Sequence, residues 1–246
     1  MDDDFPNDGR KVLMWLETPL NPFGTSFSIE HCESIALSSL GHPYFSDSLH
    51  CTLDAKKVHA IPGGILGVDS TFAPPGIQDP FSWGADIVMH SATKYLAGHS
   101  DALVGTLSVR TQDEWRKLWN IRTYTGSNSG SLDTWLLLRS LRTFHVRTSR
   151  QFKTATLLVK WLESLTEKNH SGQEDGTKGF IKRVWHTSLQ ENAGDLVAED
   201  GSKQMTKGPA CFSILMTKEI YAEWLGPKLQ LFFVSPPCFS VFAWLI

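Results

Sequence analysis

The sequence predicts a layered α/β fold, and three observations lead to this class. Short apolar runs end abruptly in polar residues, which is the pattern of buried strands. Segments with apolar residues at helical spacing alternate with these runs along the chain. No internal repeat is visible. Because helices must cover the apolar faces of a sheet, this alternation indicates helices packed against a central sheet.

The strands are predicted from apolar runs, and the first three end in clusters of polar residues. These clusters are residues 17–22, 69–72 and 90–95. Each cluster holds groups that can bind a ligand, including a carboxylate, an amide, hydroxyls and a lysine. The expected strands cover residues 11–16, 65–68, 87–89, 180–185 and 210–216.

The helices are predicted from caps and apolar stripes. Ser28 and Asp54 are suitable N-cap residues, and Thr111 with Glu114 forms a capping-box pattern. Phe152 and Val159 belong to one apolar stripe of a later helix. Residues 38–53 show no clear period and are expected to form a loop. The expected helices start at 28, 54 and 111 and cover 132–146, 150–165 and 219–225.

Charge and cysteine content exclude several classes of function. The 246 residues include 23 Lys and Arg and 26 Asp and Glu, which gives a net charge of −3. This balance gives no reason to expect nucleic acid or a membrane surface as a partner. The N-terminus is acidic, unlike a targeting leader. The four cysteines show no CxxC spacing and the His and Cys residues fit no zinc pattern, so we expect a cytoplasmic protein without a metal.

The composition changes near residue 147, which predicts a domain boundary there. The predicted domains are a large domain over residues 1–147 and an α/β domain over residues 148–246. Residues 229–246 are rich in Phe and aliphatic residues but are interrupted by Pro236 and Pro237. We expect an irregular tail after about residue 230 and no membrane anchor.

The polar strand ends suit pyridoxal 5′-phosphate (PLP). In an open α/β sheet, ligands bind outside the carboxyl ends of the strands. PLP needs an amine for its aldehyde, a carboxylate beside its ring nitrogen, and hydroxyl or amide donors for its phosphate. Lys94 can supply the amine, Asp69 the carboxylate, and Ser91 and Thr93 the phosphate donors.

The same residues carry a resemblance to a known family. Residues 68–109, which contain the SATKY block and the upstream Asp69, resemble the signature of the Cys/Met-metabolism PLP enzymes. This family includes cystathionine γ-synthase, cystathionine lyases and homoserine sulfhydrylases. ETPLNP at 17–22 and LLLRSLRTFHVR at 136–147 are similar to two further family motifs. The resemblance covers most of residues 11–230.

The resemblance implies a fold-type I PLP enzyme with a partial large domain and a smaller C-terminal α/β domain. It implies that Lys94 is the Schiff-base lysine and later the acid–base. It also implies that Asp69 pairs with the pyridine nitrogen, that Ser91 and Thr93 bind phosphate, that Asn21 lies near the phenolic oxygen, and that Thr71 supports the ring face or Asp69. The implied reaction is β- or γ-elimination or γ-replacement on a sulfur- or oxygen-substituted amino acid, by a homodimer or homotetramer.

The sequence also departs from the family pattern. A Gly-rich phosphate turn, a ring-stacking aromatic residue and a Tyr/Arg pair are expected upstream of Glu17 and are not found there. The motif expected to supply an arginine for the substrate carboxylate does not appear near the C-terminus. A truncated, catalytically incompetent fragment or pseudoenzyme is therefore an alternative, and an aminotransferase on the same fold is a weaker one.

Several of these residues also have simpler interpretations. Asn21 precedes a proline and suits a turn, and Ser91 and Thr93 suit helix caps. Three arginines are expected on a solvated or inter-subunit helix face, and two tryptophans are expected in the core or at an interface. These residues are Arg139, Arg142, Arg147, Trp115 and Trp119.

Overall fold

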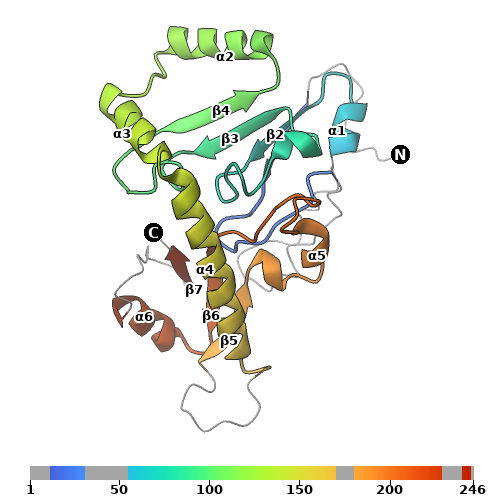
Figure 1. The fold of residues 1–246 in the computed structure, drawn as a ribbon. Helices are drawn as coiled ribbons and strands as arrows, with labels where there is room; N and C mark the ends of the chain where they lie inside the picture. The colour runs from blue at the N-terminus through green and yellow to red at the C-terminus, as the bar shows by residue number, and fades with distance from the viewer. Residues whose placement is uncertain (1–11, 31–54, 170–179, 229–239, 245–246) are drawn as a thin grey trace.

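The computed structural model describes residues 12–30, 55–169, 180–228 and 240–244, which form two sheets linked by a long helix (Figure 1). The strands are β1 (Leu13–Glu17), β2 (Ile65–Asp69), β3 (Ile87–Ser91), β4 (Gly105–Val109), β5 (Ile181–Trp185), β6 (Cys211–Met216) and β7 (Ser240–Trp244). The α-helices are α1 (Ala55–Ala60), α2 (Gln112–Thr125), α3 (Ser131–Leu141), α4 (Phe144–Ser164), α5 (Ala193–Leu196) and α6 (Glu219–Lys228). Short 3₁₀ turns lie at Pro80–Trp83 and Thr187–Leu189.

The first sheet has the strand order β1-β2-β3-β4, in which β1, β2 and β3 are parallel and β4 is antiparallel to β3. Glu17 pairs with Asp69, and Asp69 pairs with Met89. The carboxyl ends of three strands therefore meet at one edge, and the expected α/β arrangement is confirmed. Strand β4 was not predicted, because its mixed residues GTLSV give no continuous apolar run.

One face of this sheet is covered by an apolar cluster. Ala55 and Val58 of α1 pack against residues of β1, β2 and β3, and Val58 is fully buried. Full burial of a Val or Leu side chain stabilises the fold by about 1.5–3 kcal/mol. The sheet residues of this cluster are Leu16, Leu66, Val68 and Val88.

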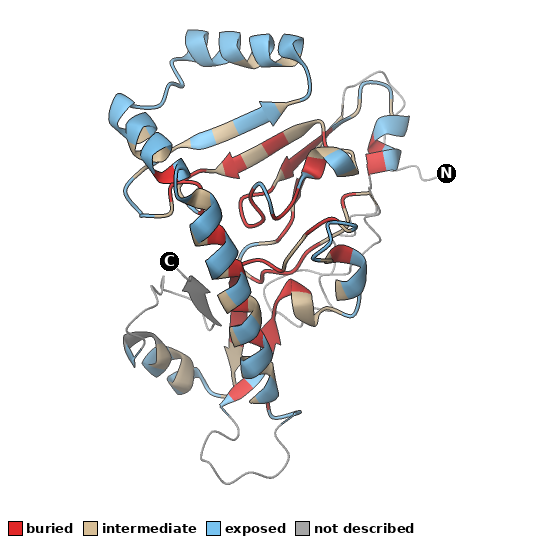
Figure 2. Cartoon of the chain, in the orientation of Figure 1, coloured by how far each residue is buried: buried red, intermediate tan, exposed pale blue. Residues whose placement is uncertain are grey.

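The opposite face of the sheet is exposed over part of its area in the described chain (Figure 2). Leu13, Trp15 and Leu107 on this face are 60%, 46% and 52% exposed. Gly67 of β2 lets the indole of Trp15 lie across the strand, because a Cβ at this position would come within 2.4 Å of the ring. The paired residues Glu17 and Asp69 lie on this same face, since they follow Trp15 and Gly67 at a spacing of two.

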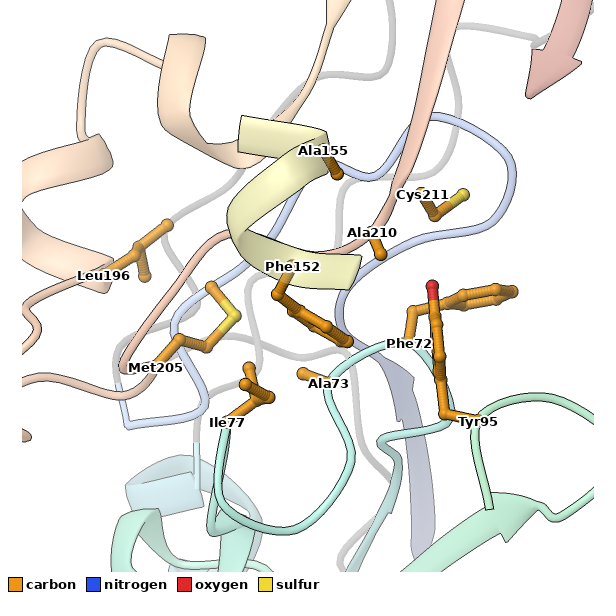
Figure 3. Close-up of a cluster of buried hydrophobic side chains, with 10 residues drawn as sticks. All are labelled: Phe72, Ala73, Ile77, Tyr95, Phe152, Ala155, Leu196, Met205, Ala210 and Cys211. Carbon is orange, nitrogen blue, oxygen red and sulfur yellow. The ribbon is translucent and has the colours of Figure 1, made fainter. Parts of the chain in front are cut away.

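Helix α4 joins the two halves of the chain. Its residues Phe152 and Ala155 pack with Phe72 and Tyr95 in a buried cluster (Figure 3). One turn later, Val159 packs against β5 and β6 of the second sheet, whose order is β5-β6-β7 with antiparallel pairing. The stripe predicted from Phe152 and Val159 is thus confirmed.

The helix boundaries near residue 147 differ from the prediction. The apolar pattern predicts helices over 132–146 and 150–165, whereas α3 ends at Leu141 and α4 begins at Phe144. Thr143 has φ −108° and ψ 4°, outside helical geometry, and its N–H donates to Ser140 O at 3.2 Å. Apolar spacing continues through this turn, so the pattern did not locate the break.

The expected tail also differs, since residues 240–244 form β7, an edge strand that pairs with β6. The expected loop at 38–53 and most of the helix expected from Ser28 lie outside the described residues. The assignment of 1–147 and 148–246 to two domains stays a prediction. In the described ranges, no helix is both long and apolar enough to cross a membrane.

Candidate active site

The candidate site lies at the edge where β1, β2 and β3 end. The N–H of Thr18 donates to Asp69 O at 3.2 Å, and the N–H of Ser70 donates to Met89 O at 3.0 Å. These bonds continue the parallel ladders one residue past the strands. The segments that follow β1, β2 and β3 therefore leave the sheet side by side, with their polar residues gathered at one edge.

Thr71 connects the ends of β2 and β3. Its backbone N–H donates to Asp69 Oδ1 at 2.9 Å, and its Oγ1 accepts the N–H of Ser91 at 2.8 Å. Its hydroxyl also lies 3.9 Å from Met89 Sδ, where it makes a weak donor contact. Thr71 is buried and Asp69 is half-buried. The carboxylate is thus held by a neighbour that is itself fixed to the next strand.

Two hydroxyls and a lysine follow directly on β3. Ser91 Oγ and Thr93 Oγ1 lie 2.7 Å apart, and both residues are half-buried. The N–H of Lys94 donates to Ser91 O at 3.2 Å, and the Lys94 side chain is exposed. Since one proton is shared between the hydroxyls, the other remains available to an acceptor such as a phosphate oxygen. Asp69, Thr71, Ser91, Thr93 and Lys94 are called the strand-end site below.

Tyr95, next to Lys94, anchors this turn in the core. Its ring lies 5.1 Å from that of Phe152 and 6.4 Å from that of Phe72, measured between centroids. Figure 3 shows its hydroxyl on the side of Ala210 and Cys211, and no hydrogen bond to this hydroxyl is found in the described structure. Burial raises the pKa of the Tyr95 phenol well above its ordinary value, so the phenol stays neutral.

The segment after β1 is fixed by the second half of the chain. Pro22 O accepts the hydroxyl of Ser213 at 2.7 Å and the thiol of Cys211 at 3.5 Å. Gly24 has φ +64°, and a Cβ there would come within 1.9 Å of Cys211 O, so only glycine fits this close approach. Strand β6 therefore sets the position of the loop that carries Asn21.

The electrostatics of this edge are set by two carboxylates and a lysine. Burial raises the pKa of Glu17, the N–H of Asn21 opposes this by donating to Oε1 at 3.1 Å, and the charge of Asp69 raises the pKa further. Burial raises the pKa of the Cys211 thiol to about 12, and the charges of Glu17 and Lys94 act on it in opposite directions. Cys211 is therefore a neutral thiol beside the site.

His90 lies on the covered face of β3, beneath the site. Burial lowers the pKa of its imidazole, while the negative charge of Asp69 raises it. Its Nε2 is buried and has no hydrogen-bond partner in the described part of the chain. The ring is therefore neutral at physiological pH.

Buried glutamines hold the loops of the site together, and sequence reasoning missed them. Gln78 Nε2 donates to Thr18 O and to Ser70 Oγ, both at 2.9 Å, so one amide joins the segments after β1 and β2. Gln204 Nε2 donates to Gln78 Oε1 at 2.9 Å. No local pattern marks these side chains, because their partners lie 60 or more residues away or in irregular segments.

The structure brings five of the six predicted site residues into the strand-end site. Asn21 lies on the neighbouring loop, is exposed, and is held through its backbone N–H. Trp115 and Trp119 were expected in the core or at an interface; they are 44% and 45% exposed, which excludes the core and leaves the interface as a prediction. Arg139 and Arg142 are exposed, but Arg147 is half-buried against the Lys94 turn, so Arg147 does not lie on a fully solvated face.

The donor set of the strand-end site fits PLP. It combines one lysine amine, one carboxylate supported by a backbone N–H, and a close pair of hydroxyls on one turn. These are the groups that the aldehyde, the ring nitrogen and the phosphate require. Among the described residues, no group of His, Cys, Asp and Glu is arranged to hold a metal ion.

Comparisons with known proteins agree with this chemistry. The profile of the family described as Cys/Met metabolism PLP-dependent enzyme matches residues 45–235. Human cystathionine gamma-lyase is 36% identical over 152 residues, which are 62% of this chain and 32% of the relative. Cystathionine gamma-synthase of Escherichia coli K12 is 36% identical over 136 residues, 55% of this chain and 32% of the relative.

The fold is similar to that of solved structures. A methionine gamma lyase from Micromonospora echinospora, solved in its apo form, matches with a TM-score of 0.66 and 27% identity, over 92% of this chain and 51% of that one. The chain spans about a third of the length of the curated relatives it matches.

Proposed function

The chain belongs to the Cys/Met metabolism PLP-dependent enzyme family, and from this premise we propose that the strand-end site binds PLP through Lys94. The observation that carries the proposal is the hydrogen-bonded chain from Asp69 through Thr71 to Ser91, which joins a carboxylate to the turn bearing the lysine. The proposed activity is trans-sulfuration, namely β/γ-elimination or γ-replacement on sulfur- or oxygen-substituted amino acids.

Each residue of the site has a proposed role. Lys94 Nζ holds the cofactor aldehyde, and Asp69 accepts the N–H of the pyridine ring. Ser91 and Thr93 donate to the phosphate, and their 2.7 Å separation supports this assignment. Thr71 orients the Asp69 carboxylate through its backbone N–H. Asn21, on the adjacent loop, contacts the phenolic oxygen or the substrate.

When bound, PLP supplies an electron sink that makes the bonds at the amino acid's α-carbon easier to break. The residues of the chain then move protons and orient the reactants. Lys94 Nζ would accept a proton from one substrate carbon and deliver it to the next. The Asp69 carboxylate would accept the N–H of the ring nitrogen and so favour the protonated form of the ring.

We further propose a cytoplasmic homodimer or homotetramer. Trp115 and Trp119 on α2 and Trp135 on α3 are each more than 40% exposed, and α2 has no buried residue among those described. Exposed apolar area of this kind is typical of assembly surfaces. The share of the curated relatives that the chain spans, 32%, leaves room for groups contributed by other chain segments or subunits.

A second candidate is a catalytically incompetent member of the family that keeps the fold and the lysine. One observation favours it: the side chains of Leu13 and Trp15 beside the site are exposed. In this case PLP is not retained, or is retained without turnover.

An assay of the purified chain with PLP tests the activity. The chain is incubated with a panel of sulfur- and oxygen-substituted amino acids, and release of oxoacid, ammonia and thiol is measured. We expect turnover by the wild type and a loss of about tenfold or more in Asp69→Asn, which removes a charge-assisted hydrogen bond. Cofactor retention without turnover by any substrate supports the second candidate instead.

A further inference from the structure

We propose that Arg147 is a positioning residue that fixes the turn bearing Lys94. This inference rests on the proposed function, because the role of the turn is to present Lys94 to PLP. Arg147 lies in the first turn of α4, more than 50 residues beyond Lys94 in the sequence. Its guanidinium nevertheless reaches the backbone directly after the lysine.

The guanidinium makes contacts with three backbone carbonyls. Nη1 donates to Tyr95 O at 3.1 Å, and Nη2 donates to Leu96 O at 3.3 Å and to Ser140 O at 3.1 Å. Nε donates to Thr143 Oγ1 at 3.2 Å. All three nitrogens of the side chain are therefore used, and two of them hold carbonyls of the Lys94 turn.

The turn has carbonyls that need such a donor. Within the turn, the N–H of Ala97 donates a hydrogen bond to Ala92 O at 2.8 Å, and the N–H of Gly98 donates one to Lys94 O at 2.7 Å. These bonds leave the carbonyls of Tyr95 and Leu96 for partners outside the turn, as at the end of a helix. Since both residues are buried, an unsatisfied carbonyl here carries a large desolvation cost.

Gly98 makes room for the guanidinium. Its φ is +70°, and a Cβ at this position would lie 2.0 Å from Arg147 Nη1. A side chain at residue 98 would therefore push the arginine away from the turn. The planar fork of arginine also reaches several acceptors at once, which a lysine ammonium on its flexible stem does not reproduce.

The same helix holds the turn a second way, through Phe152 against the ring of Tyr95. The contact between Phe152 and Tyr95 holds the turn against α4, and Arg147 orients the carbonyls of Tyr95 and Leu96. Lys94 directly precedes Tyr95 in the chain, and its backbone N–H donates to Ser91 O. Rotation of the turn would therefore move the lysine away from the Ser91 and Thr93 hydroxyls. Burial lowers the pKa of Arg147, but a guanidinium remains charged at neutral pH.

The test uses Arg147→Met and Arg147→Lys, with Arg150→Met as the matched control. Arg150 lies three residues further along α4 and is exposed, so its loss changes the same charge without touching the turn. Each protein is incubated with PLP and reduced with borohydride, and the fraction modified at Lys94 is measured by peptide mapping over a range of PLP concentrations. Hydrogen exchange of the 92–98 peptide and the melting temperature are measured without PLP.

We expect Arg147→Met to need about tenfold more PLP for half-modification of Lys94, because two or more hydrogen bonds from a charged donor are lost. Hydrogen exchange in the 92–98 peptide is expected to be faster in Arg147→Met than in the wild type. In both measurements, Arg147→Lys is expected to be intermediate and Arg150→Met to match the wild type. If Lys94 is modified at the same PLP concentration in Arg147→Met and in the wild type, at temperatures where both are folded, the positioning role is overturned. The proposed function then still stands. Absence of modification at Lys94 in the wild type overturns the proposed function and this inference with it.

Discussion

Thr71 shows what a single residue contributes to the site. Its backbone holds Asp69 and its hydroxyl holds the N–H of Ser91, so it ties a strand end to the neighbouring strand. The sequence predicted Asp69 and Ser91 as site residues because they follow apolar runs, and the family resemblance implied Thr71. It did not predict the bond between Thr71 and Ser91, since a contact across 20 residues depends on the strand register.

Thr71→Val is expected to destabilise the protein by roughly 1–3 kcal/mol, because the partly buried N–H of Ser91 loses its acceptor. Thr71→Ser keeps the hydroxyl and serves as the control. Urea denaturation of the two variants and the wild type measures the difference. Equal midpoints for Thr71→Val and the wild type would show that this bond does not hold the strand ends.

His186 is a second residue whose environment gives a defined prediction. Its Nε2 donates to Pro209 O at 2.7 Å, and its Nδ1 accepts the N–H of Ser188 at 3.1 Å. Both bonds suit the neutral ring, and burial lowers its pKa from 6.5 to about 4. The unfolded chain therefore takes up a proton before the folded chain does.

The neutral His186 therefore contributes to the free energy of unfolding, and this contribution is fully present above about pH 6.5. It is lost as the pH falls to about 4, and the total loss is about 3 kcal/mol. His186→Gln removes this titration. Denaturation of both proteins at several pH values between 7 and 4 is the measurement. A difference between variant and wild type that stays constant with pH contradicts the assignment.

At the scale of elements, the strands that form short apolar runs and one helix cap were predicted correctly. Strands β1, β2, β3, β5 and β6 and the Thr111 capping box lie where the sequence indicated them. The misses have physical reasons: β4 and β7 depend on pairing with a neighbouring strand, and the break between α3 and α4 lies inside a continuous apolar pattern. These features are set by tertiary contacts and not by local sequence.

Helix α2 is predicted to depend on its cap, because none of its described residues is buried. Thr111 Oγ1 accepts the N–H of Glu114 at 3.3 Å, and Glu114 Oε2 accepts the N–H of Thr111 at 3.0 Å. Thr111→Ala is expected to cost about 1 kcal/mol and to speed amide exchange in α2 about fivefold. Thr111→Ser is the control, and unchanged exchange in the alanine variant refutes the dependence.

At the scale of the whole molecule, the two halves are joined through the site. Helix α4 packs on the Lys94 turn and on β5 and β6, while β6 holds the loop after β1 (Figure 1). The residues of the site were predictable because their chemistry and spacing are local. Gln78, Gln204 and Arg147 were not, because each acts on backbone groups that only the folded chain brings near.

The central claim is that Lys94 binds PLP at the ends of β1, β2 and β3. An absorbance spectrum of the purified chain, incubated with PLP and dialysed, tests it directly when wild type and Lys94→Ala are compared. We expect a visible band that survives dialysis in the wild type and is absent in Lys94→Ala, with equal far-UV circular dichroism. No retained band in the wild type, or the same band in both proteins, would contradict the assignment of Lys94 as the cofactor lysine.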